Sequence, residues 1–154
     1  MPTRTRLVAA AIAATMLTGA PGRADTVSLD AAKDNTIYQT DDPFLSNGSG
    51  DHFFVGRNNQ IPGINLRRAL IEFDPTGSIP AGSTITGVTL RLNCSRTNAG
   101  PQTITMHRAL LEWGEGASDA DGNEGSGGLA EPGDATWAHA IFPTDPWSAL
   151  GGDF

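Results

Sequence analysis

The sequence predicts an all-β protein whose strands form an antiparallel β-sandwich or a similar jelly roll. Short segments alternate apolar and polar residues with a period of two, as half-buried strands do. Loops rich in glycine and proline separate these segments, and no stretch shows the helical period of about 3.6 residues. Short strands joined by such loops close most naturally into two packed sheets.

The first 24 residues are expected to form a signal peptide that is removed on export. Arg4 and Arg6 precede an apolar run from Leu7 to Leu17, and small residues lead to an expected cleavage site after Ala24. The run is shorter than the roughly 20 residues of a membrane-spanning helix. We therefore expect a secreted, extracellular protein with no membrane span, in which residues 25–154 form one domain.

The charge of the chain is negative and unevenly distributed. The whole sequence has a net charge of −7, and loss of the expected signal peptide leaves seven of the ten basic residues and all 17 acidic ones, or −10. Arg108 is the last basic residue, and nine acidic residues follow it. A protein of this charge is not expected to have a nucleic-acid partner, because phosphate backbones bind to basic surfaces.

The clearest strands lie at residues 68–73 and 88–94, where every other residue is apolar. The loop between them contains several prolines and glycines and is too long for a two-residue hairpin. Cys94 is the single cysteine, so the chain allows no internal disulfide, and its strand position predicts a buried apolar thiol. The apolar faces of the two strands are expected to form the core: Ala69, Ile71, Phe73, Val88, Leu90 and Leu92.

Shorter segments of the same kind predict the remaining strands. They lie at residues 26–31, 34–40, 52–56, 104–107 and 138–142. Polar loops are expected at residues 41–51 and 57–65. The acidic stretch from Glu112 to Gly152 is so rich in glycine and proline that it is expected to be mostly irregular.

Six segments together resemble a known family. They are DNTIY (34–38), FFVGR (53–57), RRALIEFD (67–74), SIPAGSTITGVTLRL (78–92), TMHRALLEWGEG (105–116) and GDATW (133–137). This series is similar to the DNRLRE domain, also called the disaggregatase-related repeat, over nearly all of residues 25–154. The resemblance implies a β-sandwich module of exported bacterial and archaeal proteins, similar to carbohydrate-binding modules. Some members of that family recognise uronic-acid polysaccharides such as alginate.

In members of that family, further strands usually follow the segment that corresponds to the residues just before Phe154. The resemblance therefore implies an incomplete sandwich without its C-terminal strands, or one that another domain or chain completes. The expected function is that of a secreted, non-catalytic polysaccharide-binding module for acidic uronate glycans. The alternative is a structural or adhesive module of the cell surface or matrix, completed by a partner chain.

The candidate polysaccharide-binding residues are Arg57, Arg68, Arg108, Trp137 and Trp147. A flat indole ring covers the apolar face of a pyranose, and a guanidinium binds a sugar carboxylate with two hydrogen bonds. Both groups have a structural alternative. The tryptophan rings also suit the core, and Arg68 also suits a pair with Glu72 on the same strand face.

The loop SDADGNEG, residues 118–125, is a candidate calcium site through Asp119, Asp121 and Asn123. Calcium prefers clustered oxygen ligands on a flexible loop, although a solvated acidic loop without metal has the same composition. No cofactor other than this structural calcium is expected. The sequence contains no nucleophile elbow and no HExxH zinc motif, and no carboxylate pair stands out, so we do not expect an enzyme.

Overall fold

The computed structural model describes residues 25–59 and 63–154, and the expected signal peptide at residues 1–24 lies outside this part. The described residues form short strands and no helix, and every strand pair is antiparallel. The predicted all-β class is therefore confirmed. Within these two ranges, no helix has the length and apolar character needed to cross a membrane.

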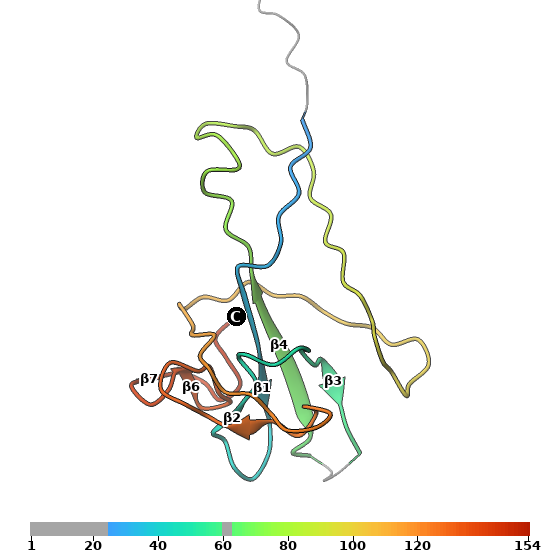
Figure 1. Ribbon diagram of the computed structural model, residues 1–154, viewed down its shortest axis with the longest axis vertical. Coiled ribbons are helices and arrows are strands. Elements are labelled where there is room, and N and C mark those ends of the chain that lie inside the picture. The colour runs from blue at the N-terminus through green and yellow to red at the C-terminus, as the bar shows by residue number, and fades with distance from the viewer. Residues whose placement is uncertain (1–24, 60–62) are drawn as a thin grey trace, which may run out of the picture.

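The central sheet has three strands in the order β1–β4–β3 (Figure 1). Strands β1 (Lys33–Tyr38) and β4 (Leu66–Glu72) pair along their whole length, and β3 (Gly56–Arg57) adds a short edge to β4. The strands predicted at 34–40 and 68–73 correspond to β1 and β4. The sheet is thus built around one of the two strands that the sequence marks most clearly.

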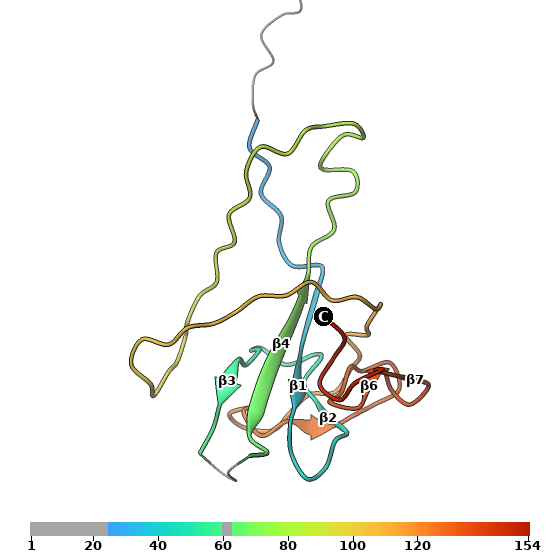
Figure 2. The same ribbon diagram turned by 180° about the vertical axis from the view of Figure 1, so that it is seen from behind.

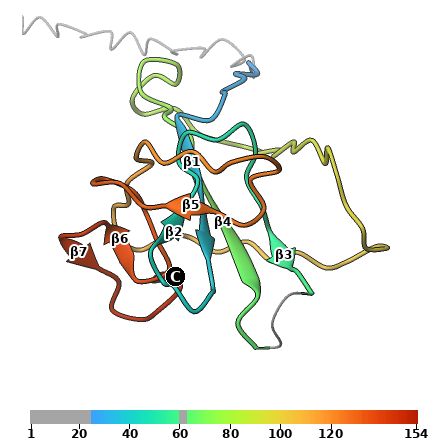
Figure 3. The same ribbon diagram turned by 60° about the horizontal axis from the view of Figure 1, so that its bottom comes forward.

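Two further strand pairs lie beside this sheet. Strand β2 (Leu45–Ser46) pairs with β5 (Gly128–Leu129), and β6 (His139–Ile141) pairs with β7 (Asp145–Pro146). Strand β2 contacts β1, as Figure 3 shows from below. The short strand predicted at 138–142 is confirmed as β6.

The hydrophobic core lies on one face of the central sheet and consists mainly of tryptophan. The buried cluster comprises Ile37, Trp113, Ala135, Trp137, Ala140 and Trp147, with Leu66 and Leu70 packed against it. Leu66 and Leu70 alternate along β4 with Ala69 and Ile71, so the core uses the opposite face from the predicted one. The expectation that Ala69, Ile71 and Phe73 form the core is wrong, because none of them belongs to the buried cluster or packs against it.

Buried polar side chains hold the irregular C-terminal half against the sheet. The Oδ1 atom of Asn35 accepts hydrogen bonds from the Ser46 hydroxyl and the Asn47 amide, at 3.0 and 3.1 Å. The carboxylate of Asp134 accepts from the backbone amides of Ser118 and Glu131. Among the described residues, no buried side-chain nitrogen or oxygen lacks a partner. Because side chains satisfy the loop backbone in this way, a glycine-rich segment covers the core without forming a ladder.

The strand predicted at 52–56 overlaps β3 only at Gly56, and three other predicted strands are not paired. Residues 26–31, 88–94 and 104–107 belong to no strand, and the stretch between β4 and residue 112 runs out from the sheet and back (Figures 1 and 2). Val88 is 85% exposed and Leu92 is 52% exposed, so the expectation that Val88, Leu90 and Leu92 lie in the core is wrong. Cys94 is exposed as well, and the predicted buried thiol is also wrong. The pattern of these segments is that of a strand, but the described residues provide no neighbouring strand to complete the ladder.

Candidate functional site

One arginine and three aromatic rings meet where the C-terminal residues cross β4. The Cζ atom of Arg68 lies 5.0 Å from the ring centroid of Trp137 and 4.8 Å from that of Phe154. The ring of His107 lies 4.9 Å from the Phe154 ring, at an angle of 49°. These four residues, Arg68, His107, Trp137 and Phe154, are called the Arg68 cluster below.

The position of Arg68 in β4 brings its side chain to this place. Arg68 lies between Leu66 and Leu70 in the alternation of the strand, so it points to the face that the tryptophans cover. A guanidinium nitrogen of Arg68 donates a hydrogen bond to the carbonyl oxygen of Gly151. The amide of Gly151 in turn donates to the carbonyl oxygen of Trp137 at 2.7 Å. Gly151 therefore connects the C-terminal segment to both Arg68 and Trp137.

Gly151 is required at this crossing for two reasons. Its φ of 91° lies in the left-handed region that favours glycine. A β-carbon there would lie 2.7 Å from Arg68 Nη1 and 2.7 Å from Trp137 Cζ2, closer than side-chain atoms pack. No other residue allows the chain to pass so close to the arginine and the indole.

A hydrogen-bonded turn holds the residues that precede Phe154. The Asp153 carboxylate accepts hydrogen bonds from the Ser148 hydroxyl and from the backbone amides of Ser148 and Ala149. The bonds from Ser148 lower the pKa of Asp153. The carbonyl oxygen of Asp153 accepts from the amide of Leu110 at 3.0 Å, which connects the turn to the segment that carries His107.

Arg68 forms no ion pair among the described residues. The predicted partner Glu72 lies 3.2 Å from Nζ of Lys33 on β1, and Lys33 also lies 2.6 Å from Glu112. The structural alternative for Arg68 in the sequence, a pair with Glu72, is therefore wrong. Burial lowers the pKa of Arg68 from its ordinary value, but a guanidinium keeps its charge at neutral pH. The cluster thus presents a half-buried cation with unused hydrogen-bond donors.

The two predicted tryptophan platforms lie in the core. Trp137 is 6% exposed and Trp147 is 7% exposed. The Nε1 atom of Trp147 donates to the carbonyl oxygen of Thr136 at 2.9 Å, as is usual for a buried indole. Of the two alternatives that the sequence leaves open for these rings, the structure has the core position, where their large apolar area stabilises the protein. The exposed rings of the cluster are those of His107 and Phe154, and Phe154 is 54% exposed.

The other two predicted arginines are exposed and lie at different places. Arg57 is opposite Leu66 in the β3–β4 ladder, and its guanidinium lies 3.3 Å from Oδ1 of Asn65. It therefore shares a sheet face with Arg68 at the β3 edge. Arg108 directly follows His107 of the cluster and makes no ion pair within the described residues.

Sequence reasoning missed His107 and Phe154. Neither residue belongs to a period-two pattern with Arg68, and the three positions lie far apart along the chain. The end of the chain approaches β4 only because Gly151 and the buried tryptophans guide it there. No sequence signal other than the aromatic character of the last residue could have indicated this contact.

The residues of the predicted calcium loop do not fit that metal. Asp119, Asp121 and Asn123 are exposed, and Oδ1 of Asn123 lies 3.4 Å from a guanidinium nitrogen of Arg96. A cation held this close to one of three proposed ligands repels Ca²⁺. In the part of the chain described here, no group of three or more His, Cys, Asp or Glu side chains is arranged to hold a metal ion.

A second polar cluster, which the sequence did not indicate, surrounds the carboxylate of Glu124. Its Oε2 atom accepts hydrogen bonds from Asn47 Nδ2 and from the His52 amide, both at 2.9 Å, and Oε1 lies 3.4 Å from His52 Nδ1. Desolvation raises the pKa of Glu124, but the hydrogen bonds from Asn47 and His52 outweigh it and lower the pKa overall. Glu124 also has a φ of 57°, so it ends the acidic loop in a left-handed turn. We interpret this cluster as structural, since its members hold one another.

No protein-family model, curated protein or solved structure matches this chain. The resemblance to the DNRLRE domain stays a prediction from the sequence. The chemistry of the Arg68 cluster and its surroundings is therefore the main indication of function.

Proposed function

We propose that the protein is a secreted, non-catalytic β-sandwich module that binds acidic, uronate-containing polysaccharides through the Arg68 cluster. The sequence resemblance and the expected signal peptide support this class of function. The observation that carries the proposal is the guanidinium of Arg68, which has no carboxylate partner among the described residues and lies 4.8 Å from the exposed ring of Phe154.

The two groups provide the two interactions that a uronate needs. A pyranose ring has an apolar face that packs on an aromatic ring, and Phe154 offers such a surface. The carboxylate of the same or the next sugar accepts hydrogen bonds from Arg68, whose donors are not used up by the single bond to Gly151. The ring of Trp137 also contacts the Arg68 guanidinium and holds it in place by a cation–π interaction.

The neighbourhood of Arg68 also suits a polymer. Arg108 follows His107 in the chain, and Arg57 lies on the same sheet face as Arg68. These two exposed arginines would contact further uronate units of a long glycan. A polyanion approaching a protein of net negative charge needs such a local group of cations.

Isothermal titration calorimetry of the purified chain with alginate, polygalacturonate and a neutral glucan tests the proposal. We expect binding to the two uronate polymers and none to the neutral one. The variant Arg68→Gln should weaken uronate binding by roughly tenfold or more, since a hydrogen bond to a charged group contributes about 1.5–3 kcal/mol.

Arg96→Gln is the matched control, because it removes the same charge from an exposed arginine whose contact is with Asn123. It should change the dissociation constant by less than about twofold, which is the scale of a screened long-range charge effect. Equal losses in both variants would mean that net charge alone attracts the polymer. Absence of binding to every uronate polymer would overturn the proposal.

A further inference from the structure

The stretch of residues 75–111 exposes an unusual amount of apolar surface. Six of its large apolar side chains are between 52% and 85% exposed: Ile85, Val88, Leu92, Ile104, Met106 and Leu110. Isolated exposed side chains of this kind are normal, but a concentration of them marks an interaction surface. Figures 1 and 2 show that this stretch runs outside the strand-containing part of the molecule.

The backbone of the same stretch is unpaired over most of its length. Between Thr84 and Ala109, no backbone amide or carbonyl of the described chain hydrogen-bonds to another backbone group. The alternation of Val88, Leu90 and Leu92 with polar residues is that of a strand with one apolar face. A strand with free donors and acceptors pairs readily with a strand from another chain.

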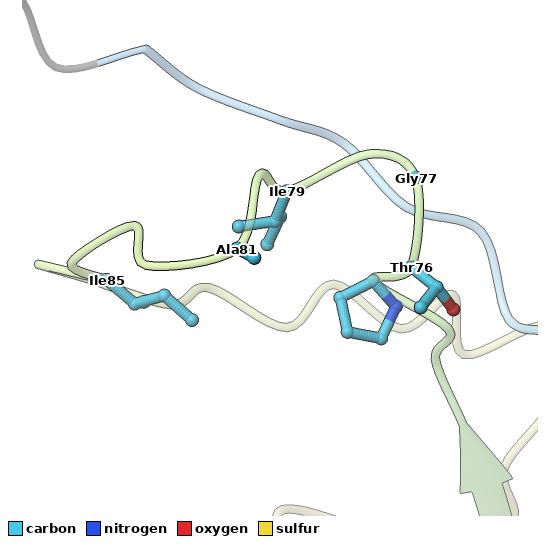
Figure 4. A pocket seen from close by; sticks show the side chains of 6 residues that line it. Thr76, Gly77, Ile79, Ala81 and Ile85 are labelled. Carbon is cyan, nitrogen blue, oxygen red and sulfur yellow. The ribbon is translucent and has the colours of Figure 1, made fainter.

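An apolar hollow lies at the start of this stretch. It has a volume of about 370 Å³ and is lined by Pro75, Thr76, Gly77, Ile79, Ala81 and Ile85. Figure 4 shows Ile79, Ala81 and Ile85 on the loop that follows β4, with Thr76 at the start of that loop. A hollow of this kind receives an apolar side chain of a partner.

The charge of the stretch indicates which partner fits. Residues 75–111 contain three arginines and no acidic residue, whereas residues 112–154 contain nine acidic residues and no lysine or arginine. Exposed acids of that second half include Asp119, Asp121, Glu131 and Asp145. The chain therefore carries a basic apolar surface and an acidic surface that complements it. A polyanionic glycan would match the arginines but not the aliphatic side chains, so the surface favours a protein.

We propose that residues 75–111 form the surface through which two copies of this chain associate. The basic stretch of each copy lies along the acidic half, residues 112–154, of the other copy. The unpaired segment at 85–92 adds backbone hydrogen bonds to this contact. Such an arrangement is closed by a two-fold axis, because each copy gives and receives the same surfaces. The inference does not rest on glycan binding, although the two surfaces include His107, Arg108, Trp137 and Phe154 of the proposed glycan site, and different experiments measure the two.

Sedimentation velocity of the purified chain over a series of concentrations tests this inference. We expect a monomer–dimer equilibrium that shifts towards monomer at about 1 M salt, where charges are screened within roughly 3 Å. Val88→Lys should raise the dimer dissociation constant at least about tenfold, since a lysine on a strand edge prevents pairing. Arg91→Glu should raise it as well, because it reverses one charge of the basic stretch.

Val55→Lys is the matched control, because Val55 is 46% exposed and lies outside the stretch. Tryptophan fluorescence and circular dichroism of each variant should match the unaltered chain, which excludes misfolding as the cause. A chain that stays monomeric at its highest soluble concentration would overturn the inference. So would equal effects of the lysine substitutions at Val88 and Val55. Loss of polygalacturonate binding in Arg91→Glu without any self-association would assign the surface to a polyanion instead, and would also overturn it.

Discussion

Nζ of Lys33 on β1 lies 3.2 Å from Oε2 of Glu72 on β4. The two residues are directly opposite in the register of the central sheet. Glu72, the carboxylate that the sequence suggests as a partner for Arg68, therefore pairs with Lys33 instead. Lys33 also lies 4.5 Å from the ring of Trp113 and donates a hydrogen bond to the Trp113 carbonyl oxygen at 2.8 Å. One lysine therefore links the sheet to the core, and Arg68 has no ion pair among the described residues.

Replacing Lys33 by methionine should destabilise the protein. The change removes the contacts of the ammonium with Glu72, Glu112 and the Trp113 ring, but both carboxylates are well exposed and contribute little. We expect a loss of about 1 kcal/mol in the free energy of unfolding, mostly from the cation–π contact and the hydrogen bond. Urea denaturation followed by tryptophan fluorescence measures it.

The pH dependence provides a separate check on Lys33. Desolvation lowers the pKa of Lys33, but its hydrogen bonds and attraction to Glu112 and Glu72 raise it overall above 10.5. The stabilisation is therefore present below pH 10.5 and is lost as the pH rises through the higher pKa of the folded state. The unaltered chain and Lys33→Met should converge in stability at strongly alkaline pH. A difference that stays constant up to that pH would contradict the ionic origin.

Replacing Glu124 by glutamine should destabilise the protein near neutral pH. The amide group of glutamine places a donor opposite the donors of Asn47 and His52, and we expect a loss of about 1–3 kcal/mol. Because the pKa of Glu124 is lowered on folding, its stabilisation is present above about pH 4.5 and is lost as the pH falls through the folded pKa. Chemical denaturation from pH 7 to acid should show the difference between the two chains shrinking below pH 4.5. A difference independent of pH would mean that the substitution acts by shape alone.

Replacing Gly151 by alanine should destabilise the Arg68 cluster more than the same change at Gly152. Both glycines have a positive φ, 91° and 105°, so both variants suffer similar backbone strain. Only at position 151 does the new methyl group collide with Arg68 and Trp137, whereas at 152 the nearest atom is 3.9 Å away. We expect an additional loss of about 1–3 kcal/mol and weaker uronate binding for Gly151→Ala alone. Equal melting temperatures would contradict the close packing described above.

Replacing Trp147 by phenylalanine should cost about 2–3 kcal/mol, because it removes buried area and leaves the Thr136 carbonyl without its indole donor. Leu129→Ala, at a side chain that is 75% exposed, should change the stability by less than about 0.5 kcal/mol. Acrylamide should quench the fluorescence of the unaltered chain weakly, since all three tryptophans are buried. Strong quenching would show that one of the rings is accessible.

Parts of the fold could be predicted from the sequence because they depend on local patterns. The alternation in residues 68–73 and 34–40 predicts β4 and β1, and the absence of a helical period predicts the all-β class. The same patterns predict strands around Val88 and Met106, and these predictions are wrong. Alternation shows that a segment is able to form a strand, but it does not show whether a partner strand is present. Arg68 and Trp137 were recognised as candidate site residues, but the role of the indole was reversed from ligand platform to core.

Local sequence patterns indicate which segments can form strands, where the charge lies, and which arginine and aromatic residues are candidates for binding an acidic glycan. Only the folded chain shows which sheet face is buried, that Glu72 pairs with Lys33, and that Phe154 and His107 join Arg68 in one cluster. Local patterns depend on residues that are neighbours in the sequence. The buried face and the residue pairs depend instead on contacts between segments that are far apart in the sequence. Packing three tryptophans against Leu66 and Leu70 buries a large apolar area, which favours this face of the sheet as the core face.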